Sequence, residues 1–448
     1  MTIKSKLTTV GMLAALTAGL IAGDLQAEAN SQPSTSPIYT VDTDPTNRQE
    51  NVDAARVDDL HRQRLASGVK GDALYKLAED RKYVVGTPVR DHGIQAVTNI
   101  DFAECARTHS NPVEMPYWFK DKYNACRNWG LLIRYLEPVN GVIQEVGRSV
   151  LGLTFIGLAR DRENKIDFGL RIVPIPDGDE RKTLKDTTSL TISLGCVNSD
   201  NARESVCEKS QGGVTKTIRQ WELTGETSPV WWSTSGITTT VPADKYKDEK
   251  RGYFNFDLAL TTIGAAGVAD QSFTPLEYFR CDEANYVFGS KCVFNHVLSY
   301  ITFYANDPTY GESARFIRDA QTDITLTKPG IKGKQVPGRL GHSPLHRLAP
   351  RYDVNSNIPG SRRKVRRTCR HYFGAKYTSG PNNTKRECDE YPFATTYQNA
   401  ARVNEHALDS FAVRAITASH NGTAGNLYGT WLGSDHILDG DPFYVVVR

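Results

Sequence analysis

Cys388-Asp-Glu-Tyr-Pro-Phe-Ala394 is the stretch around which the C-terminal region of this chain is organised. It places a thiol and two adjacent carboxylates directly before an aromatic–proline pair. A central strand does not favour Asp-Glu, and proline cannot donate to a sheet ladder. The stretch therefore predicts that Asp389 and Glu390 are fixed against an apolar wall, an environment that prepares a carboxylate for proton or metal chemistry.

A basic segment precedes the acids. Ser361-Arg-Arg-Lys-Val-Arg-Arg-Thr-Cys-Arg370 is either a helix face or an arm lying along phosphates, and a processing site or a solvated helix is the alternative. Residues 331–448 hold 17 Lys and Arg against 9 Asp and Glu, whereas the remainder holds 37 against 42. The C-terminal region is thus predicted to meet a polyanion. The candidate phosphate-binding residues of the segment are Arg362, Arg363, Arg366, Arg367 and Arg370.

The eight cysteines indicate disulfides rather than a zinc site, because none has a C-x-x-C spacing. Eight cysteines allow 105 connectivities, and pairing of sequence neighbours is the favoured one. It would tie the basic segment to the acidic stretch through its last pair. The predicted pairs are Cys105–Cys126, Cys196–Cys207, Cys281–Cys292 and Cys369–Cys388.

The first residues are typical of an export signal. Lys4 and Lys6 precede an apolar run from Val10 to Gly23, and Ala27-Glu-Ala29 offers a small-x-small cleavage site. A membrane anchor is the alternative, but the run is short and its downstream flank is polar. We expect residues 1–29 to be removed and the mature protein to be secreted with no transmembrane segment.

The remainder divides by composition. Residues 30–94 are a polar lead-in with a loosely helical stretch, and 95–326 contain short apolar strands that predict an antiparallel sandwich, ending in a short helix at 311–320. Residues 327–343, rich in Pro, Gly and Lys, are predicted to be a linker. Trp231-Trp232, with Trp221 nearby, would form either a sugar- or peptide-binding face or ordinary core packing.

Residues 344–448 are predicted to form a small α+β domain. The expected order is the acidic stretch, a strand at 411–416, a polar turn at 417–425, one or two helical turns at 426–432 and a strand at 441–448. His420 and Asn421 lie in the polar turn, where such residues are common for backbone reasons. Together with two carboxylates they predict a one-metal site with water ligands.

The set of motifs in this domain resembles the secreted NucA/NucB deoxyribonucleases. The acidic stretch is followed about 30 residues later by Ser-His-Asn-Gly-Thr-Ala-Gly, and then by Asp-Pro-Phe-Tyr-Val-Val-Val. The resemblance covers Pro344 to Arg448 and implies a ββα-metal core. The roles it implies are Asp389 as general base, Asn421 as metal ligand, Glu390 as ligand or orienting group, and Arg386 as phosphate contact.

The chain also departs from the family pattern. Some members have Asp where this chain has His420, and some have Glu at the place of Arg414. The residues that complete the metal site, with His420 and Glu390 as candidates beside Asn421, therefore stay open.

The resulting hypothesis is a secreted Mg²⁺- or Mn²⁺-dependent endonuclease that hydrolyses extracellular DNA, and RNA as a further candidate, without sequence preference. Two alternatives remain. One is an exported binding or adhesion protein that recognises a glycan or an anionic polymer without catalysis. The other is a secreted nuclease toxin that the β-rich region carries. The partner of the β-rich region is left unassigned.

Overall fold

The computed structural model describes residues 39–42, 83–88, 98–108, 117–176, 182–198, 205–238, 250–264, 269–274, 277–402 and 410–448. The predicted signal segment at 1–29 and the loosely helical stretch of the lead-in lie outside these ranges. Within them, no helix has the length and apolar character needed to cross a membrane.

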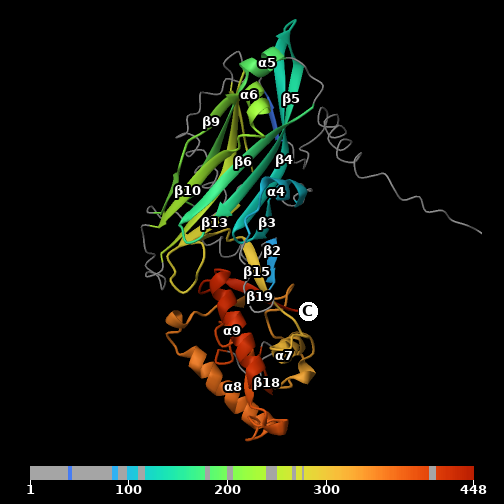
Figure 1. The fold of residues 1–448 in the computed structure, drawn as a ribbon, viewed down its shortest axis with the longest axis vertical. Coiled ribbons are helices and arrows are strands. Elements are labelled where there is room, and N and C mark those ends of the chain that lie inside the picture. Colours follow the sequence, from blue (N-terminus) through green and yellow to red (C-terminus); the bar gives the residue numbers. More distant parts are fainter. Residues whose placement is uncertain are drawn as a thin grey trace, which may run out of the picture.

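Two antiparallel sheets form the β-rich end of the molecule (Figure 1). The first runs in the order β1-β4-β5-β6-β10-β8 with β3 paired to β4, and only its β1–β4 pair is parallel among the described residues. Its strands are β1 Tyr39–Asp42, β3 Trp118–Asp121, β4 Asn124–Val139, β5 Val142–Ala159, β6 Lys165–Ile175, β8 Ser205–Lys209 and β10 Val230–Thr238.

The second sheet runs in the order β14-β13-β11-β7-β9, with β12 paired to β11. Its strands are β7 Ser189–Asn198, β9 Val214–Thr217, β11 Arg251–Ile263, β12 Ala269–Phe273, β13 Glu277–Asp282 and β14 Cys292–Val293. Three short helices accompany the two sheets: α4 Phe102–Thr108, α5 Lys182–Thr187 and α6 Ile218–Thr224.

Alternating apolar residues explain why these sheets stack. Side chains two apart on a strand point to the same face. On the first sheet Leu151, Leu153 and Phe155 are buried at this spacing, and on the second Phe254 and Phe256 are buried likewise, all in one shared core. The predicted antiparallel sandwich is thereby confirmed.

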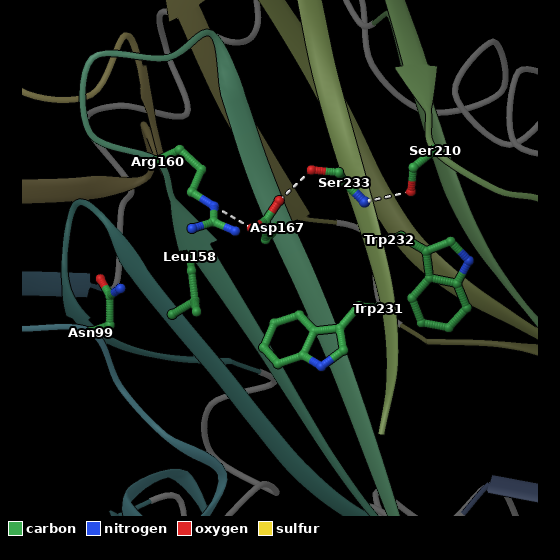
Figure 2. Close-up of a pocket in the computed structure, with 8 residues that line it drawn as sticks. All are labelled: Asn99, Leu158, Arg160, Asp167, Ser210, Trp231, Trp232 and Ser233. Carbon is green, nitrogen blue, oxygen red and sulfur yellow. Dashed lines mark hydrogen bonds and ion pairs between the residues drawn. The ribbon is translucent and has the colours of Figure 1, made fainter. Parts of the chain in front are cut away.

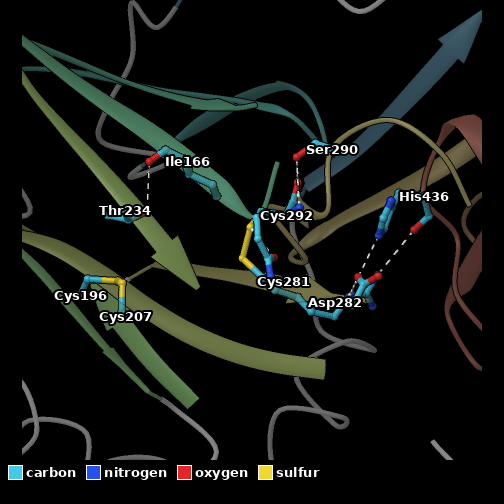
Figure 3. Close-up of a disulfide and its surroundings, with 11 residues drawn as sticks. Ile166, Cys196, Cys207, Thr234, Cys281, Asp282, Ser290, Cys292 and His436 are labelled. Atoms are coloured by element: carbon cyan, nitrogen blue, oxygen red, sulfur yellow. Dashed lines mark hydrogen bonds and ion pairs between the residues drawn. A yellow bond between two sulfur atoms is a disulfide. The ribbon is translucent and has the colours of Figure 1, made fainter. Parts of the chain in front are cut away.

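All four predicted disulfides are present. They are Cys105–Cys126, Cys196–Cys207, Cys281–Cys292 and Cys369–Cys388. The third links neighbouring strands β13 and β14 (Figure 3). Disulfides of this number are typical of proteins that fold in an oxidising compartment.

The C-terminal end of the molecule is a mixed α+β unit. One sheet has the order β16-β19-β15-β2, and β17 and β18 form a separate hairpin. Three helices surround them (Figure 1). The elements are β2 Tyr83–Pro88, β15 Val297–Phe303, α7 Gly311–Thr322, β16 Leu345–His346, α8 Asn357–Phe373, β17 Arg386–Tyr391, β18 Ala412–Thr417, α9 Ala418–Ser434 and β19 Pro442–Val447.

Strand β15 and helix α7, which precede the predicted domain start at residue 344, pack into this unit. Ile301 of β15 and Phe316 of α7 share a buried core with Trp431 of α9 and Phe443 of β19. Because β15 pairs in parallel with β19, the strand belongs to the C-terminal sheet although the predicted boundary assigned it to the β-rich domain.

The segment predicted as a linker, residues 327–343, is not a free spacer. The Nζ of Lys334, which is only 4% exposed, donates to the carbonyl of Pro329 at 2.7 Å and to that of Phe411 at 3.2 Å. Val336 is also buried in the C-terminal core. Its Pro- and Gly-rich composition therefore marks ordered coil that packs against the hairpin.

Of residues 417–425, predicted as a polar turn, Thr417 ends β18 and residues 418–425 begin helix α9. Their glycines and small polar residues are poor helix formers. The helix is nevertheless continuous because Ala424, Tyr428, Trp431 and Leu432 are buried along one side of it. Tertiary packing here outweighs local propensity.

A buried charged cluster joins the two ends of the molecule. Arg280 of β13 donates from both terminal nitrogens to the carboxylate of Asp441, at 2.8 and 3.0 Å. It also contacts Asp282, whose carboxylate lies 2.8 Å from Nε2 of His436 (Figure 3). A buried charge needs such partners, so these contacts specify how the β-rich region meets the C-terminal unit.

Candidate active site

The β17–β18 hairpin has a helix on each face. Helix α8 covers the face of Cys388 and Glu390, through a disulfide from Cys369 and a hydrogen bond from Ser361. The other face, which carries Glu387 and Asp389, meets α7 and α9. Adjacent residues of a strand point to opposite faces, so the two neighbouring acids are separated by the sheet.

Glu387, Asp389 and Asn421 meet on the α9 face. The side-chain nitrogen of Asn421 donates to Oε2 of Glu387 at 2.9 Å, in a solvent-exposed position. Asp389 is half-buried two residues further along, and its Oδ1 accepts the backbone N–H of Glu390 at 2.8 Å. The sequence singled out Asp389 and Asn421 but missed Glu387, although a period of two from Asp389 points to it.

Burial raises the pKa of Asp389 to about 7. The hydroxyl of Ser313 and the N–H of Glu390 favour the charged form, whereas the carboxylates of Glu312 and Glu387 oppose it. Desolvation is the largest cause. A carboxylate with this pKa is suited to accept a proton near neutral pH.

Glu312, in the first turn of α7, links three parts of the site. Its Oε2 accepts the backbone N–H of Thr417 at 2.9 Å, and its Oε1 lies 3.3 Å from Nη2 of Arg386. Desolvation opposes its ionisation, but these contacts hold the pKa of Glu312 below its usual range. Nothing in the sequence placed this residue at the site, since it lies 77 positions before Asp389.

His420 and Arg386 are both engaged by these neighbours. The backbone N–H of Glu312 donates to Nδ1 of His420 at 3.2 Å, so in the neutral ring the proton is on Nε2 and neither nitrogen offers a lone pair to a metal. Arg386 donates to Glu312 and to the carbonyl of Ala415. The geometry therefore does not favour His420 as a ligand, and it places Arg386 at the Glu312 side of the site.

Glu390 lies on the α8 face, away from Asn421. Its Oε2 accepts the hydroxyl of Ser361 at 2.8 Å, and that hydroxyl in turn accepts the N–H of Ala400 at 3.1 Å. Desolvation and the charge of Asp389 raise the pKa of Glu390 to about 7, although Arg362 and Arg366 counteract them. Strand alternation puts Glu387, and not Glu390, beside Asn421, while the role of Glu390 as a metal ligand stays a prediction.

The basic segment lies within helix α8, so it is a helix face and not an extended arm, and its contact with phosphates stays a prediction. Ser361, Val365 and Cys369 are buried at helical spacing against the hairpin. The opposite side is exposed and carries the predicted arginines. These are Arg362, Arg363, Arg366, Arg367 and Arg370.

The donor set suits a hard divalent cation. No group of three His, Cys, Asp or Glu side chains that could hold a metal occurs among the described residues. Glu387, Asp389 and Asn421 still present carboxylate and amide oxygens on one face, and Mg²⁺ often binds through one or two carboxylates while keeping several waters. The residues present therefore fit such an ion.

Residues 343–446 match the family model of deoxyribonuclease NucA/NucB. The C-terminal region is a NucA/NucB deoxyribonuclease domain. No curated protein gives a significant match to the chain. The matched residues contain the hairpin, α8 and α9 of the nuclease domain, whereas Glu312 and the rest of α7 lie before them.

Proposed function

We propose that this chain is a secreted, metal-dependent endonuclease that hydrolyses phosphodiester bonds of extracellular DNA without sequence preference. The observation that carries the proposal is the single face formed by Glu387 and Asp389 of β17 and Asn421 of α9. It lies in a strand–strand–helix unit within the NucA/NucB domain. The four disulfides support folding in an oxidising compartment.

In this proposal Asp389 is the general base. It removes a proton from a water molecule as the water oxygen bonds to phosphorus and the bond from phosphorus to the leaving sugar oxygen breaks. Arg386, the first residue of β17, is held by Glu312 and stabilises the phosphate. Glu390 is a positioning residue that fixes β17 to α8 through Ser361.

Glu387 and Asn421, with Asp389 beside them, would hold the divalent cation. Bound there, the ion would supply positive charge to offset the charge that develops on the phosphate in the transition state. The exposed arginines of α8 contact the DNA backbone. Because phosphate contacts carry no base information, this arrangement favours cleavage without sequence preference.

A plasmid-nicking assay on the full chain tests the proposal. Asp389→Asn keeps the shape of the side chain and removes the base, so nicking should fall at least about a hundredfold while DNA binding persists. Glu387→Gln should cause a similar loss of nicking and should weaken the binding of Mg²⁺, so that more Mg²⁺ is needed for half-maximal activity. EDTA should abolish nicking, and excess Mg²⁺ should restore it.

Two variants serve as controls. Glu390→Gln changes the neighbouring acid on the opposite face and should lose less activity than either Asp389→Asn or Glu387→Gln. Asp186→Asn changes an exposed aspartate of α5 and should leave nicking unchanged. Wild-type nicking by Asp389→Asn, or full activity in EDTA, would contradict the proposal.

A further inference from the structure

A pocket of ≈ 350 Å³ lies on the first sheet of the β-rich region (Figure 2). Its lining comes from β5, β6 and β10 and from residues just before α4, after β5 and after β8, with no residue of the nuclease domain among them. The volume is within the range of small-molecule sites, roughly 300–1,000 Å³. Residues central to its chemistry are Asn99, Arg160, Asp167, Ser210, Trp231 and Ser233.

The two adjacent tryptophans of β10 have different environments. Trp232 is buried in the core and donates from Nε1 to the carbonyl of Gly212 at 3.0 Å. Trp231 is 42% exposed and lies in the pocket. Trp221 is also buried, so the core interpretation holds for two of the three tryptophans, and Trp231 is available to a ligand.

The indole of Trp231 packs on the surface of the first sheet. It lies opposite Gly169 of β6, where a Cβ atom would be 2.7 Å from the indole ring. Because Gly169 has no side chain, the indole can pack directly on the backbone of β6. The ring of Phe102 flanks it, with centroids 5.6 Å apart. The indole therefore packs against Gly169 and Phe102, and it remains 42% exposed among the pocket residues that Figure 2 shows.

Hydrogen-bonded polar side chains line the pocket beside the Trp231 indole. Arg160 and the hydroxyl of Ser233 both donate to the carboxylate of Asp167, and the backbone N–H of Ser233 donates to the hydroxyl of Ser210 at 2.9 Å. Asp167 is almost fully buried, whereas the side chain of Arg160 is 56% exposed. The terminal nitrogens of Arg160 and the remaining lone pairs of Asp167 can thus bond a ligand in the pocket.

This combination is matched by a neutral sugar ring. A pyranose presents C–H groups on one face, which pack on the π-system of an indole, and hydroxyls at its rim, which both donate and accept hydrogen bonds. The pocket has little net charge because Arg160 is paired with Asp167. The chain before residue 331 is moreover acidic, with 37 Lys and Arg against 42 Asp and Glu, which disfavours a phosphate-rich ligand.

We propose that the Trp231 pocket binds a sugar unit of a neutral oligosaccharide, with the indole stacked on the ring and Arg160, Asp167 and Ser233 bonding its hydroxyls. The β-rich region is then a glycan-binding module that holds the nuclease domain near a carbohydrate surface. This inference goes beyond the proposed nuclease function and does not depend on it.

Calorimetric titration of the full chain with cellotetraose, N-acetylchitotetraose and maltotetraose tests the proposal. At least one of them should bind, and Trp231→Ala should weaken that binding by at least about tenfold. Arg160→Gln retains an amide N–H that can donate to Asp167 and should weaken binding several-fold, with the melting temperature measured alongside. Leu223→Ala, which removes a 63% exposed apolar side chain on α6, is the matched control and should bind like the wild type.

Three results would overturn the assignment. The first is that none of the three tetrasaccharides binds at millimolar concentration. The second is that both pocket variants bind sugar as tightly as the wild type. The third is that the protein binds an oligothymidylate and no sugar, and that Trp231→Ala abolishes this oligothymidylate binding. Plasmid nicking by Trp231→Ala should equal that of the wild type. Loss of nicking with an unchanged melting temperature would show that the pocket serves the nuclease instead.

Discussion

At the scale of single residues, the site depends on the alternation of one strand. Asp389 and Glu390 are neighbours in sequence but face different helices, whereas Glu387 and Asp389 share a face. An acidic pair in sequence is therefore not an acidic pair in space. The chemistry is divided accordingly, with Asp389 proposed as the base and Glu390 as a support.

Glu312 provides the residue-scale prediction. Glu312→Ala leaves the N–H of Thr417 and the guanidinium of Arg386 without their carboxylate, which should cost about 1–3 kcal/mol in the free energy of unfolding. Nicking should fall at least about tenfold, because the junction of β18 and α9 shifts next to Asn421. Urea unfolding and initial nicking rates measure the two effects.

The conservative variant Glu312→Gln separates the effect of the Glu312 hydrogen bonds from the effect of its negative charge. Glu312→Gln can still accept the N–H of Thr417 and should recover most of the stability and part of the activity. If Glu312→Ala nicks at the wild-type rate, α7 has no part in the site and the nuclease begins within the matched residues alone.

At the scale of elements, α8 combines an apolar stripe with an exposed basic side. The disulfide from Cys369 to Cys388 fixes it to β17, so the arginines hold a constant position relative to Asp389. The charges of Arg362 and Arg366 offset part of the rise in the pKa of Glu390 that burial causes. Arg363 and Arg367, one helical turn apart, are also exposed, and we predict that this pair contacts DNA.

The double variant Arg363→Gln with Arg367→Gln should therefore weaken DNA binding without changing the rate at saturating DNA. The slope of log K against log salt should decrease by about 0.9 for each phosphate that the variant no longer neutralises. Fluorescence anisotropy across a salt series measures it. Arg162→Gln, which changes an 89% exposed arginine of the β-rich region, is the control, and equal slopes in all three proteins would exclude α8 as the DNA-binding element.

At the scale of the whole molecule, the cluster of Arg280, Asp282, His436 and Asp441 holds the β-rich region and the nuclease domain together. Desolvation opposes the charge on Asp441, but the positive charges of Arg280 and Lys122 hold its pKa well below its usual range. A carboxyl whose pKa is lowered on folding adds stability above its unfolded pKa, about 3.9, and loses this contribution as pH falls further.

Asp441→Asn should consequently lower the free energy of unfolding by about 3–5 kcal/mol near neutral pH, since it leaves Arg280 without its bidentate partner. The difference from the wild type should shrink as the pH falls below about 4, because Asp441 then takes up a proton in the unfolded wild-type chain while it stays charged in the folded state. Melting temperatures between about pH 2 and pH 7 test this. Asp161→Asn, which removes an exposed pairing with Arg162, should show no such difference at any pH.

The sequence by itself determined the parts that depend on local pattern. Period-two apolar residues predicted the sandwich, and the motifs from Cys388 onward predicted the NucA/NucB domain. The even cysteines in neighbouring pairs predicted the disulfides correctly. Each of these signals is contained in residues close together along the chain.

Only the tertiary structure decided which side chains meet. It brought Glu312 to the hairpin and separated Glu390 from Asn421. It also made a helix from the glycine-containing stretch after Thr417. Finally, it left Trp231 exposed beside a buried Trp232. In each case long-range packing outweighs local propensity, because the buried core fixes which face of a strand or helix looks outward. Composition and spacing along the chain do not encode that choice.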